Sequence, residues 1–326
     1  MNNINMFDQI VQLTVDRYNI KPQSLQFLAQ ETNVLYKLTD NNDKKFLIKI
    51  FQENSSTLED NLLEVHVMNL INAKGRLSIP SILSSRDGKK IQEIETDKLN
   101  PNVRTVIYSW LEGDDLGGNE NEERFVQLGE ITALLHESTR GEVIPKNFTP
   151  KKWNQVFYFQ GEKLLYKDEK YQRFLSKEYH VIMDKIIPYL NNRLSSYYQM
   201  NESNLQLIHG DLNPWNVIVD GKNMHMIDFE DVMLGLPLHD IAILLYYYKY
   251  EAGYDFKDVK RLFFKGYEKV RPLPKFDEFD LDLFMTARRI NFMNYILVIS
   301  EDPRDFIDMS LARVKEFLFK YKLNDT

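Results

Sequence analysis

A polar loop followed by two short apolar runs, between residues 205 and 229, sets the strongest limit on how this chain can fold. The apolar lead-in LQLI passes into a loop that holds Asp211, Pro214 and Asn216. The runs NVIVD and MHMIDF then flank the turn DGKN, a pattern that predicts a β-hairpin. A hairpin returns its far end to its start, so we expect Asp228, at the end of the second run, to lie near the loop residues.

The oxygen-bearing side chains of this loop–hairpin segment indicate a metal site. Asp211 and Asp228 supply carboxylates, and Asn216 supplies an amide oxygen. Such hard oxygen ligands suit Mg²⁺, which is commonly held by one or two carboxylates together with the oxygens of substrate phosphates. The segment therefore predicts a site for Mg²⁺ beside a bound phosphate.

The composition of the 326-residue chain excludes several other kinds of protein. It has no cysteine, which excludes disulfides, Cys-based zinc sites, iron–sulfur clusters and thiol catalysis. Its 41 basic and 48 acidic residues give a net charge of −7, which does not favour nucleic-acid binding. Aromatic residues make up 13% of the chain, which is ample for a folded core.

The sequence predicts neither a membrane span nor an export signal. The longest apolar stretch, Ile241–Tyr248, has 8 residues, whereas a membrane-spanning helix needs about 20. The N-terminus lacks the basic start and apolar run of a signal peptide. We therefore expect a cytoplasmic protein without a membrane partner.

The first third of the chain has the pattern of an amphipathic helix followed by a small sheet with one helix. The segments 24–31, 34–40 and 45–51 are strand-like, and the turn NNDKK between the last two predicts a hairpin. Further strand signals cover 79–85 and 91–95, which flank the turn RDGKK, and a β-rich segment begins at residue 102.

The remainder of the chain is rich in helical patterns. Composition shifts at 109–113 from β-rich to a loop rich in glycine and acidic residues, and we place a boundary between two lobes there. Apolar residues then recur at helical spacing in NEERFVQLGEITALLHE and over 154–200 and 255–320.

A lysine on the third predicted strand is a candidate partner for a carboxylate on the helix that follows. Lys49 lies between two isoleucines, and Glu64 shares one face of the predicted helix with the apolar residues Val67, Met68 and Ile71. A carboxylate in an apolar stripe needs a cationic partner, because an unpaired buried charge is costly. Lys49 is the natural partner; the alternative is that both side chains are solvated.

The loop–hairpin segment also carries the pattern H-x-D-L-x-x-x-N followed by an Asp-Phe pair, which is the kinase catalytic signature. The matching residues are His209, Asp211, Leu212, Asn216, Asp228 and Phe229. On these residues the chain resembles the aminoglycoside phosphotransferase/choline kinase-like family, the small-molecule relatives of protein kinases. The resemblance covers essentially the whole chain.

The resemblance implies a bilobal, protein-kinase-like α+β fold. Residues 1–108 would form the smaller lobe, with a five-stranded antiparallel sheet and one helix that contact the nucleotide phosphates. Residues 109–113 would form the hinge, and residues 114–326 a larger, mostly helical lobe with the catalytic loop and the substrate site.

The resemblance also assigns roles to the loop and hairpin residues. Asp211 would be the catalytic base that accepts the proton of the substrate hydroxyl, and Asn216 and Asp228 would be the Mg²⁺ ligands. His209 is interpreted as a structural residue that ties the loop down. Asp240 is interpreted as structural too, as the N-cap of the following helix or a brace for the catalytic loop.

In the first lobe, Lys49 would hold the α- and β-phosphates and Glu64 would hold Lys49 in place. Backbone groups of Ser109 and Leu111 would hydrogen-bond adenine. The chain departs from the kinase pattern in its phosphate-binding hairpin, because AQETNVLYKL contains no glycine. The choice between ATP and GTP is therefore open, with ATP as the expected co-substrate.

The leading interpretation is an ATP- and Mg²⁺-dependent phosphotransferase that acts on a hydroxyl group of a small molecule. An amine-bearing acceptor, such as an aminoglycoside, choline or homoserine, is favoured because acidic residues cluster after the hinge. The alternative for that acidic run is a solvated loop. Its residues are Asp114, Asp115, Glu120, Glu122 and Glu123. If the run attracts a cationic substrate, Glu230 and Asp231 would add to that surface.

Three other functions stay open at this point. The first is a protein Ser/Thr kinase of the same fold, and the second is a nucleotide-binding scaffold without turnover. The third is a metal phosphohydrolase built on the dipeptide His239-Asp240, with His209 and Asp228 as further ligands. The expected partners of the leading interpretation are a nucleotide and a small hydroxyl acceptor, without nucleic acid.

Overall fold

The structure is a computed structural model in which contacts group the chain into two compact units. Unit 1 comprises Met1–Asn119, Val143–Thr149 and Trp215–Val232, and unit 2 comprises Glu120–Glu142, Pro150–Pro214 and Met233–Thr326. The residues it describes are 2–30, 32–52, 56–96, 99–146, 148–157, 162–251 and 253–323. The predicted hinge at 109–113 falls inside unit 1. The loop–hairpin segment, which we expected in the helical lobe, is divided between the units after Pro214.

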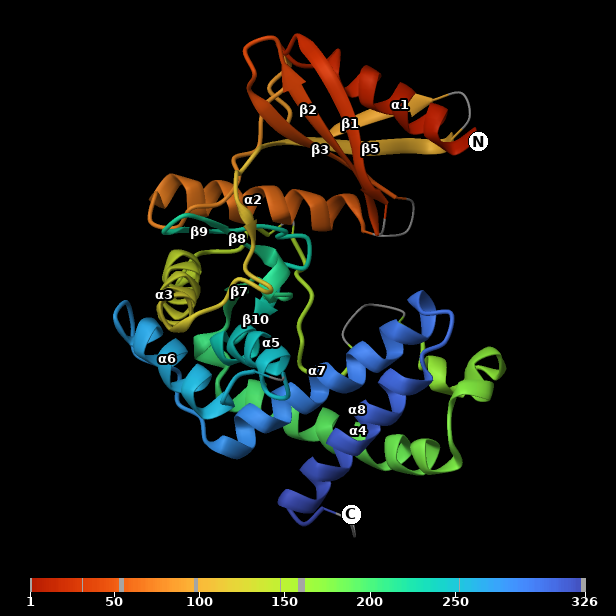
Figure 1. Ribbon diagram of the computed structural model, residues 1–326, viewed down its shortest axis with the longest axis vertical. Helices are drawn as coiled ribbons and strands as arrows, with labels where there is room; N and C mark the ends of the chain where they lie inside the picture. The colour runs from red at the N-terminus through yellow and green to blue at the C-terminus, as the bar shows by residue number, and fades with distance from the viewer. Residues whose placement is uncertain are drawn as a thin grey trace. The chain divides into compact units, whose positions relative to one another are not determined.

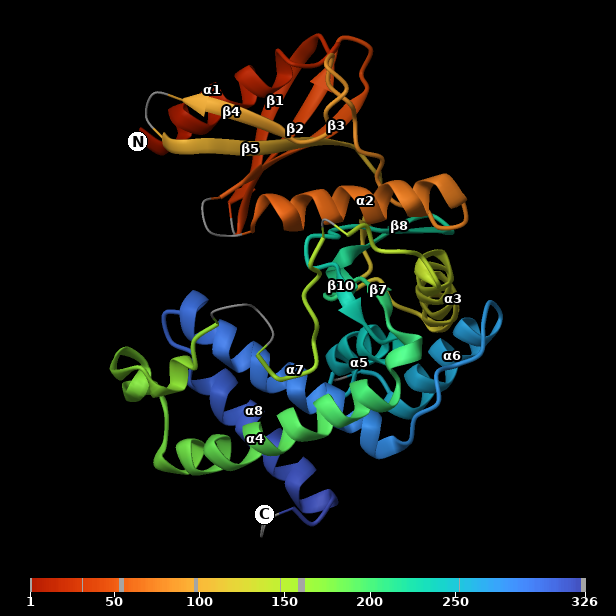
Figure 2. The ribbon, with the colours of Figure 1, turned by 180° about the vertical axis from the view of Figure 1, so that it is seen from behind.

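Unit 1 is built on a five-stranded antiparallel sheet, which confirms the predicted α+β fold class (Figure 1). The strand order is β1-β2-β3-β5-β4. The strands are β1 (Pro22–Gln30), β2 (Asn33–Asp40), β3 (Lys45–Phe51), β4 (Gln92–Thr96) and β5 (Leu99–Ser109). Helix α1 (Asn2–Val15) lies along this sheet (Figures 1 and 2) and shares a buried core with it, in which Ile10 and Val11 pack with Ile48.

Helix α2 (Leu58–Lys74) forms as its sequence predicts. Thr57 and Asp60 make a capping box, in which each side chain accepts a hydrogen bond from the other residue's backbone N–H. The helix ends at Gly75, and the face predicted to hold Glu64 among apolar residues is buried. The local sequence therefore sets both ends of the helix that carries Glu64.

The prediction of a strand over 79–85 was wrong. This segment makes one isolated bridge, between Ile82 and Tyr108, and β4 begins only at Gln92. Pro80 has no N–H to donate to a ladder. The hydroxyl of Ser85 donates to the carbonyl of Lys89 at 2.8 Å and closes the predicted turn. The apolar residues of the segment therefore pack without forming a ladder.

The predicted hairpin after the catalytic-loop motif is present in unit 1. Strands β8 (Val217–Asp220) and β9 (Asn223–Met226) pair from Val217 opposite Met226 to Asp220 opposite Asn223. The short strand β6 (Asp114–Asp115) adds to β8 and completes a three-stranded sheet. Two residues of the acidic run are thus part of a ladder.

Unit 2 is mostly helical, with one two-stranded sheet of β7 (Gln206–Ile208) and β10 (Met233–Gly235). Its α-helices are α3 (Glu122–Thr139), α4 (Lys177–Met200), α5 (Pro237–Tyr248), α6 (Phe256–Glu268), α7 (Glu278–Ile299) and α8 (Arg304–Lys320). Short 3-10 turns lie at Leu165–Lys167, Glu169–Phe174 and Glu202–Asn204, and a further one at Pro214–Asn216 spans the junction of the units.

Two glycines let α3 and α6 pack closely. A Cβ atom at Gly129 would lie 1.9 Å from the carbonyl oxygen of Phe263, and one at Gly266 would lie 1.7 Å from that of Val126. Neither position has room for a side chain, since both obstacles are backbone atoms.

The helical pattern over 154–200 overestimates the length of the helix there. Helix α4 begins at Lys177, because the Ser176 side chain caps it by accepting a hydrogen bond from the N–H of Tyr179. Part of the preceding segment forms 3-10 turns instead.

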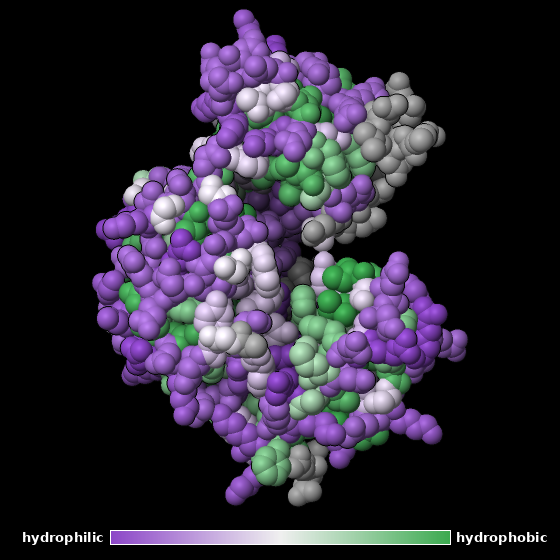
Figure 3. All heavy atoms as spheres, viewed as in Figure 1, coloured by the Kyte–Doolittle hydropathy of each residue, from purple (hydrophilic) through white to green (hydrophobic). Residues whose placement is uncertain are grey.

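Hydrophilic residues cover most of the face shown in Figure 3, in keeping with a mean hydropathy of −0.42. Among the described residues, no helix combines the length and the apolar character that crossing a membrane requires.

Candidate active site

Lys49 lies at the centre of an ion-pair cluster in unit 1. It sits on β3, opposite Leu35 of β2 and Val106 of β5, and is only 5% exposed. Its Nζ is 2.8 Å from Glu230 Oε2, 3.6 Å from Asp228 Oδ1 and 3.9 Å from Glu64 Oε1. The structure thus brings three of the predicted site residues together, with Glu230 as a fourth member.

The carboxylates keep Lys49 charged in spite of its burial. Burial alone would lower the pKa of Lys49, but the nearby charges of Glu64, Asp228 and Glu230 raise it above its ordinary value. A permanently charged ammonium group, held between strands, is suited to bind phosphate oxygens.

Glu64 is held by more than Lys49. The hydroxyl of Tyr108 donates to Glu64 Oε1 at 2.6 Å, and burial raises the pKa of Glu64 against the opposing effects of Lys49 and Tyr108. Its other oxygen, Oε2, is buried without a hydrogen-bond partner among the described residues. The predicted pair is therefore present but is the longest of the three contacts of Lys49.

Glu230 is a site residue that sequence reasoning misplaced. We expected it to add to an acidic surface for a cationic substrate, but it contacts Lys49 and accepts a hydrogen bond of 2.6 Å from Asn33 Nδ2 on β2. The feature of the sequence that could have assigned Glu230 to the site is its position two residues after Asp228. A contact across 197 residues could not be read from that spacing.

Asn216 and Asp228 flank the same end of the β8–β9 hairpin. The N–H of Ile227 donates to the carbonyl of Asn216 at 3.0 Å, which ties the two ends together. Asp228 has a positive φ of 60°, a conformation that aspartate tolerates better than most residues. Its side chain is 50% exposed, so its carboxylate is accessible to a ligand.

The donor chemistry of this pair fits Mg²⁺. A carboxylate and an amide supply oxygen ligands only, and phosphate oxygens would complete the set. Over the residues that the structure describes, no group of three or more His, Cys, Asp or Glu side chains could hold a metal by itself. Asn216 and Asp228 as the ligands stay a prediction.

In unit 2, Asp240 braces the loop that carries Asp211. Its Oδ2 accepts from the N–H of His209 at 2.8 Å, its Oδ1 accepts from the N–H of Gly210 at 2.9 Å, and His136 Nε2 lies 3.1 Å from Oδ2. Burial alone would raise the pKa of Asp240, but His136 and the other donors hold it below its ordinary value. Asp240 is not an N-cap, since α5 begins at Pro237 and its N-cap is Leu236.

The two histidines of the proposed phosphohydrolase set have structural contacts. His209 Nδ1 accepts a hydrogen bond of 3.4 Å from the N–H of Asp211, in line with its expected structural role. His239 Nδ1 lies 2.7 Å from the hydroxyl of Tyr198, and its ring stacks on Trp153 at 4.1 Å between centroids. The dipeptide His239-Asp240 thus supports the loop and the core, and these contacts weaken the phosphohydrolase interpretation.

Asp211 lies in unit 2 with its carboxylate held on both oxygens. Arg288 Nη2 donates to Oδ1 at 2.5 Å, and Asn213 Nδ2 donates to Oδ2 at 3.0 Å. Arg288 also donates to the hydroxyl of Tyr247 at 3.1 Å. The Asp211 side chain is 25% exposed. This arrangement fixes the orientation of the predicted base; its distance from Asp228 stays a prediction.

Arg288 is the second site residue that sequence reasoning missed. It lies 77 residues after Asp211, in the middle of α7, where the helical pattern shows only a basic residue among apolar ones. Its guanidinium group also lies near the rings of Trp153 and Phe292. Packing of α7 in unit 2 is what brings it to Asp211.

We expect Arg288→Met to lower kcat about 10- to 100-fold, because a base that loses its orienting partner is misplaced by an ångström or more. The KM for the nucleotide should stay unchanged, since Lys49 and Asp228 are untouched. Arg288→Lys should restore part of kcat. Steady-state kinetics measure these changes. The control is Arg304→Met, which removes an exposed ion pair to Asp302. An unchanged kcat in a folded Arg288→Met enzyme would contradict an orienting role.

The predicted hinge residues end the sheet of unit 1. Ser109 pairs with Phe46, its N–H donates to the carbonyl of Ser81 at 2.8 Å, and its Oγ accepts from the N–H of Ser81 at 2.9 Å. The N–H of Trp110 donates to the carbonyl of Lys45 at 3.3 Å. Because two N–H groups are already bonded, adenine contacts through Leu111 and the Ser109 carbonyl stay a prediction.

The acidic run does not form one cluster. Asp114 and Asp115 belong to β6, whereas Glu122 and Glu123 lie in the first turn of α3, where negative charge favours the helix N-terminus. Glu120 accepts hydrogen bonds from the hydroxyls of Tyr248 at 3.2 Å and Tyr254 at 3.0 Å. These structural positions weaken the argument that the run attracts a cationic substrate.

The chain is similar to known proteins over most of its length. A model described as the phosphotransferase enzyme family matches residues 25–273. Amicoumacin kinase of Bacillus subtilis (strain 168) is 23% identical over 243 residues, which are 73% of this chain and 67% of that protein.

Solved structures show the same fold over nearly the whole chain. The amicoumacin kinase hAmiN, in complex with AMP-PNP, Ca²⁺ and Ami, has a TM-score of 0.74 and 18% identity, and the match covers 98% of this chain and 96% of that one. A microcompartment-associated aminopropanol kinase has a TM-score of 0.75 and 18% identity, with 95% of each chain covered.

Proposed function

The chain belongs to the phosphotransferase enzyme family, and on that premise we propose that it transfers the γ-phosphoryl group of ATP to a hydroxyl group of a small, amine-bearing molecule. Mg²⁺ is the proposed metal. The family fixes the enzyme class as a phosphotransferase, and its relatives include kinases that act on small molecules. The acceptor, the nucleotide and the metal are the parts of the proposal that an experiment must test.

The observation that carries the proposal is the Lys49 cluster. A buried ammonium group lies 3.6 Å from the exposed carboxylate of Asp228, so one group suited to phosphate oxygens and one suited to a cation stand side by side. Phosphoryl transfer depends on this combination, since catalysis is mostly positioning and charge neutralisation.

The remaining roles follow from the contacts of each residue. Lys49 would hold the phosphates, and Asn216 and Asp228 would hold Mg²⁺, which when bound neutralises phosphate charge and orients the γ-phosphoryl group. Asp211, oriented by Arg288 and Asn213, would accept the hydroxyl proton of the acceptor. Asp240 keeps the loop that carries Asp211 in place through two backbone N–H groups.

An amine-bearing acceptor is supported by one relative whose name states an amino alcohol, the aminopropanol kinase. The contact of Arg288 with Asp211 adds a condition. Because a guanidinium group touches the base, we expect the acceptor ammonium group and Arg288 to lie on different sides of Asp211.

A metabolite screen tests the proposal. Purified protein is incubated with ATP, Mg²⁺ and single acceptors, which include amino alcohols, aminoglycosides, amicoumacin, choline and homoserine, and ADP release is measured. We expect turnover with an amine-bearing alcohol and none with the Asp211→Ala variant. A parallel arm replaces ATP by GTP, and another offers peptide pools. Turnover only with peptides, or equal ADP release by the variant, would overturn the proposal.

A further inference from the structure

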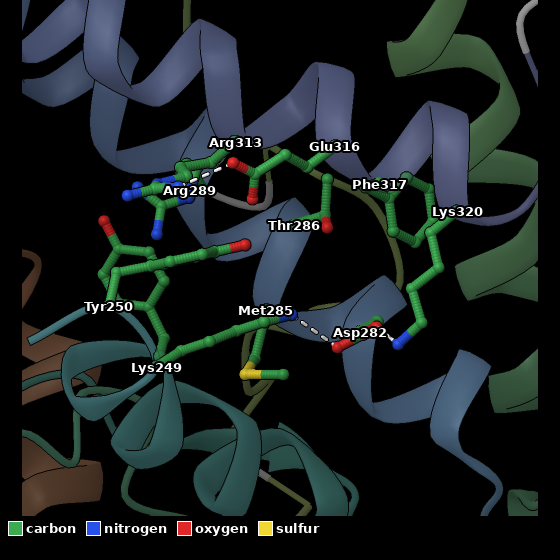
Figure 4. A pocket seen from close by; sticks show the side chains of 11 residues that line it. Lys249, Tyr250, Asp282, Met285, Thr286, Arg289, Arg313, Glu316, Phe317 and Lys320 are labelled. Carbon is green, nitrogen blue, oxygen red and sulfur yellow. Dashed lines mark hydrogen bonds and ion pairs between the residues drawn. The ribbon is translucent and has the colours of Figure 1, made fainter. Parts of the chain in front are cut away.

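A pocket of about 230 Å³ lies within unit 2, between the end of α5 and the facing sides of α7 and α8 (Figure 4). None of the predicted catalytic, metal or nucleotide residues lines it. Its volume is below the roughly 300–1,000 Å³ of pockets for drug-sized ligands, so it suits a smaller molecule.

The charged side chains of the pocket are mostly basic. Asp282 is shared by Lys249 at 2.6 Å and Lys320 at 2.8 Å, and Glu316 pairs with Arg313 at 2.6 Å. Lys320 also pairs with Glu278, which does not line the pocket, at 2.7 Å. In Figure 4, Arg289 and Arg313 lie together at one end of the pocket, away from Asp282 and Lys320. Two carboxylates therefore face four cations, which are Lys249, Arg289, Arg313 and Lys320.

Arg289 is the cation of this pocket that makes no direct ion pair among the described residues, although the charge of Glu316 acts on it from nearby. It is 6% exposed, and it takes no part in the ion pairs that the other cations of the pocket make with Asp282 and Glu316. Its hydrogen bond to Ser310 Oγ is long, at 3.5 Å. The rings of Tyr246 and Tyr250 flank it at 4.6 and 5.0 Å. Such cation–π contacts offset only part of the cost of a buried charge.

A second guanidinium group increases this excess of positive charge. Arg313 lies over the ring of Tyr250 at 4.1 Å, so Arg289 and Arg313 share one aromatic ring. Burial lowers the pKa of Arg289, and the neighbouring charge of Arg313 acts in the same direction, against the opposing effects of Tyr246, Tyr250 and Glu316. An anion in the pocket would relieve both effects, and a planar guanidinium group binds carboxylate or phosphate through two donors.

We propose that this pocket binds a small molecule through a carboxylate or phosphate group that Arg289 holds. The inference goes beyond the proposed function, because it concerns a binding site that the phosphoryl transfer does not use. Tyr247 lies next to the pocket residue Tyr246 on α5, and Arg288 lies next to Arg289 on α7. Tyr247 and Arg288 contact each other, and Arg288 contacts Asp211. An occupied pocket would thus adjoin the groups that orient the base.

Binding can be measured without turnover, so the failure of this inference and the failure of the proposed function are distinguishable. Inorganic phosphate and succinate are titrated separately into the full chain by isothermal calorimetry, with saturating AMP-PNP and Mg²⁺ to occupy the nucleotide site. We expect at least one of the two anions to bind, and Arg289→Gln to weaken that binding at least about tenfold. Arg261→Gln, on an exposed ion pair with Asp258, should bind as the original chain does.

A second variant keeps the test decisive if Arg289→Gln fails to fold. Thr286→Met fills the pocket without removing a charge, and it should abolish binding while the melting temperature stays close to that of the original chain. The proposal is overturned if neither anion binds the original chain, or if Thr286→Met or a folded Arg289→Gln binds with unchanged affinity.

Discussion

Asp211→Ala is expected to lower kcat at least about a thousandfold, because the variant loses the base and the orientation of the acceptor hydroxyl together. A positioned base alone contributes about 10²–10⁴-fold. The substitution also leaves the Arg288 guanidinium group, which contacts Asp211 at 2.5 Å, without that carboxylate. Asp211→Asn preserves the shape of the side chain and should show a loss of similar size. Steady-state ADP release with an acceptor from the screen measures the effect.

The affinity for nucleotide separates loss of catalysis from loss of structure. Calorimetry with AMP-PNP and Mg²⁺ should give nearly the same dissociation constant for the Asp211→Ala variant and the original chain, because the proposed phosphate and metal residues Lys49, Asn216 and Asp228 are unchanged. Asp258→Ala, at an exposed carboxylate on α6, is the matched control and should retain full activity. A residual rate within tenfold of the original would remove Asp211 from the role of base.

Asp228→Ala is expected to weaken the binding of Mg²⁺-AMP-PNP at least about tenfold, which corresponds to about 1.4 kcal/mol. The variant loses a carboxylate that is half exposed and that stands 3.6 Å from the Lys49 ammonium group. Without that ligand, Asn216 and the phosphates alone would have to hold the metal. Isothermal calorimetry in the presence of Mg²⁺ measures the change.

The same titration in EDTA identifies the cause of the Asp228 effect. Without the metal, Asp228 only repels the triphosphate and competes for Lys49, so the variant should then bind AMP-PNP as tightly as the original chain or more tightly. Asp220→Ala, at an exposed position on the turn of the same hairpin, controls for general damage to the hairpin. Equal affinities of variant and original chain in Mg²⁺ would show that Asp228 is not a metal ligand.

The site residues differ in how far sequence reasoning reached them. Strand and helix patterns predicted Lys49 as the partner of Glu64, and the hairpin pattern placed Asp228 near the loop. The family resemblance assigned Lys49 and Asp228 to one site, and the structure has them 3.6 Å apart. Glu230 was noticed but assigned to a substrate surface, because nothing in its neighbourhood shows that it bonds Asn33 and Lys49. Arg288 was not considered, since a basic residue in a long helix has no local signal for a distant partner.

The helices and strands also differ in how well the sequence predicted them. Helix α2 and the β8–β9 hairpin were predicted because capping residues and turn residues act over three or four positions. The strand expected at 79–85 failed because Pro80 has no N–H to donate, and the segment makes only an isolated bridge to β5, between Ile82 and Tyr108.

The amino-acid sequence alone determined the motif, its spacing, the local elements that carry it and the family resemblance. These depend on contacts between near neighbours along the chain. Only the tertiary structure decided that Glu230 is nearest to Lys49, that Arg288 orients Asp211, and that Arg289 is buried without a direct ion pair among the described residues. Such pairings depend on how separate helices and strands pack, and packing is set by the shapes of many side chains at once.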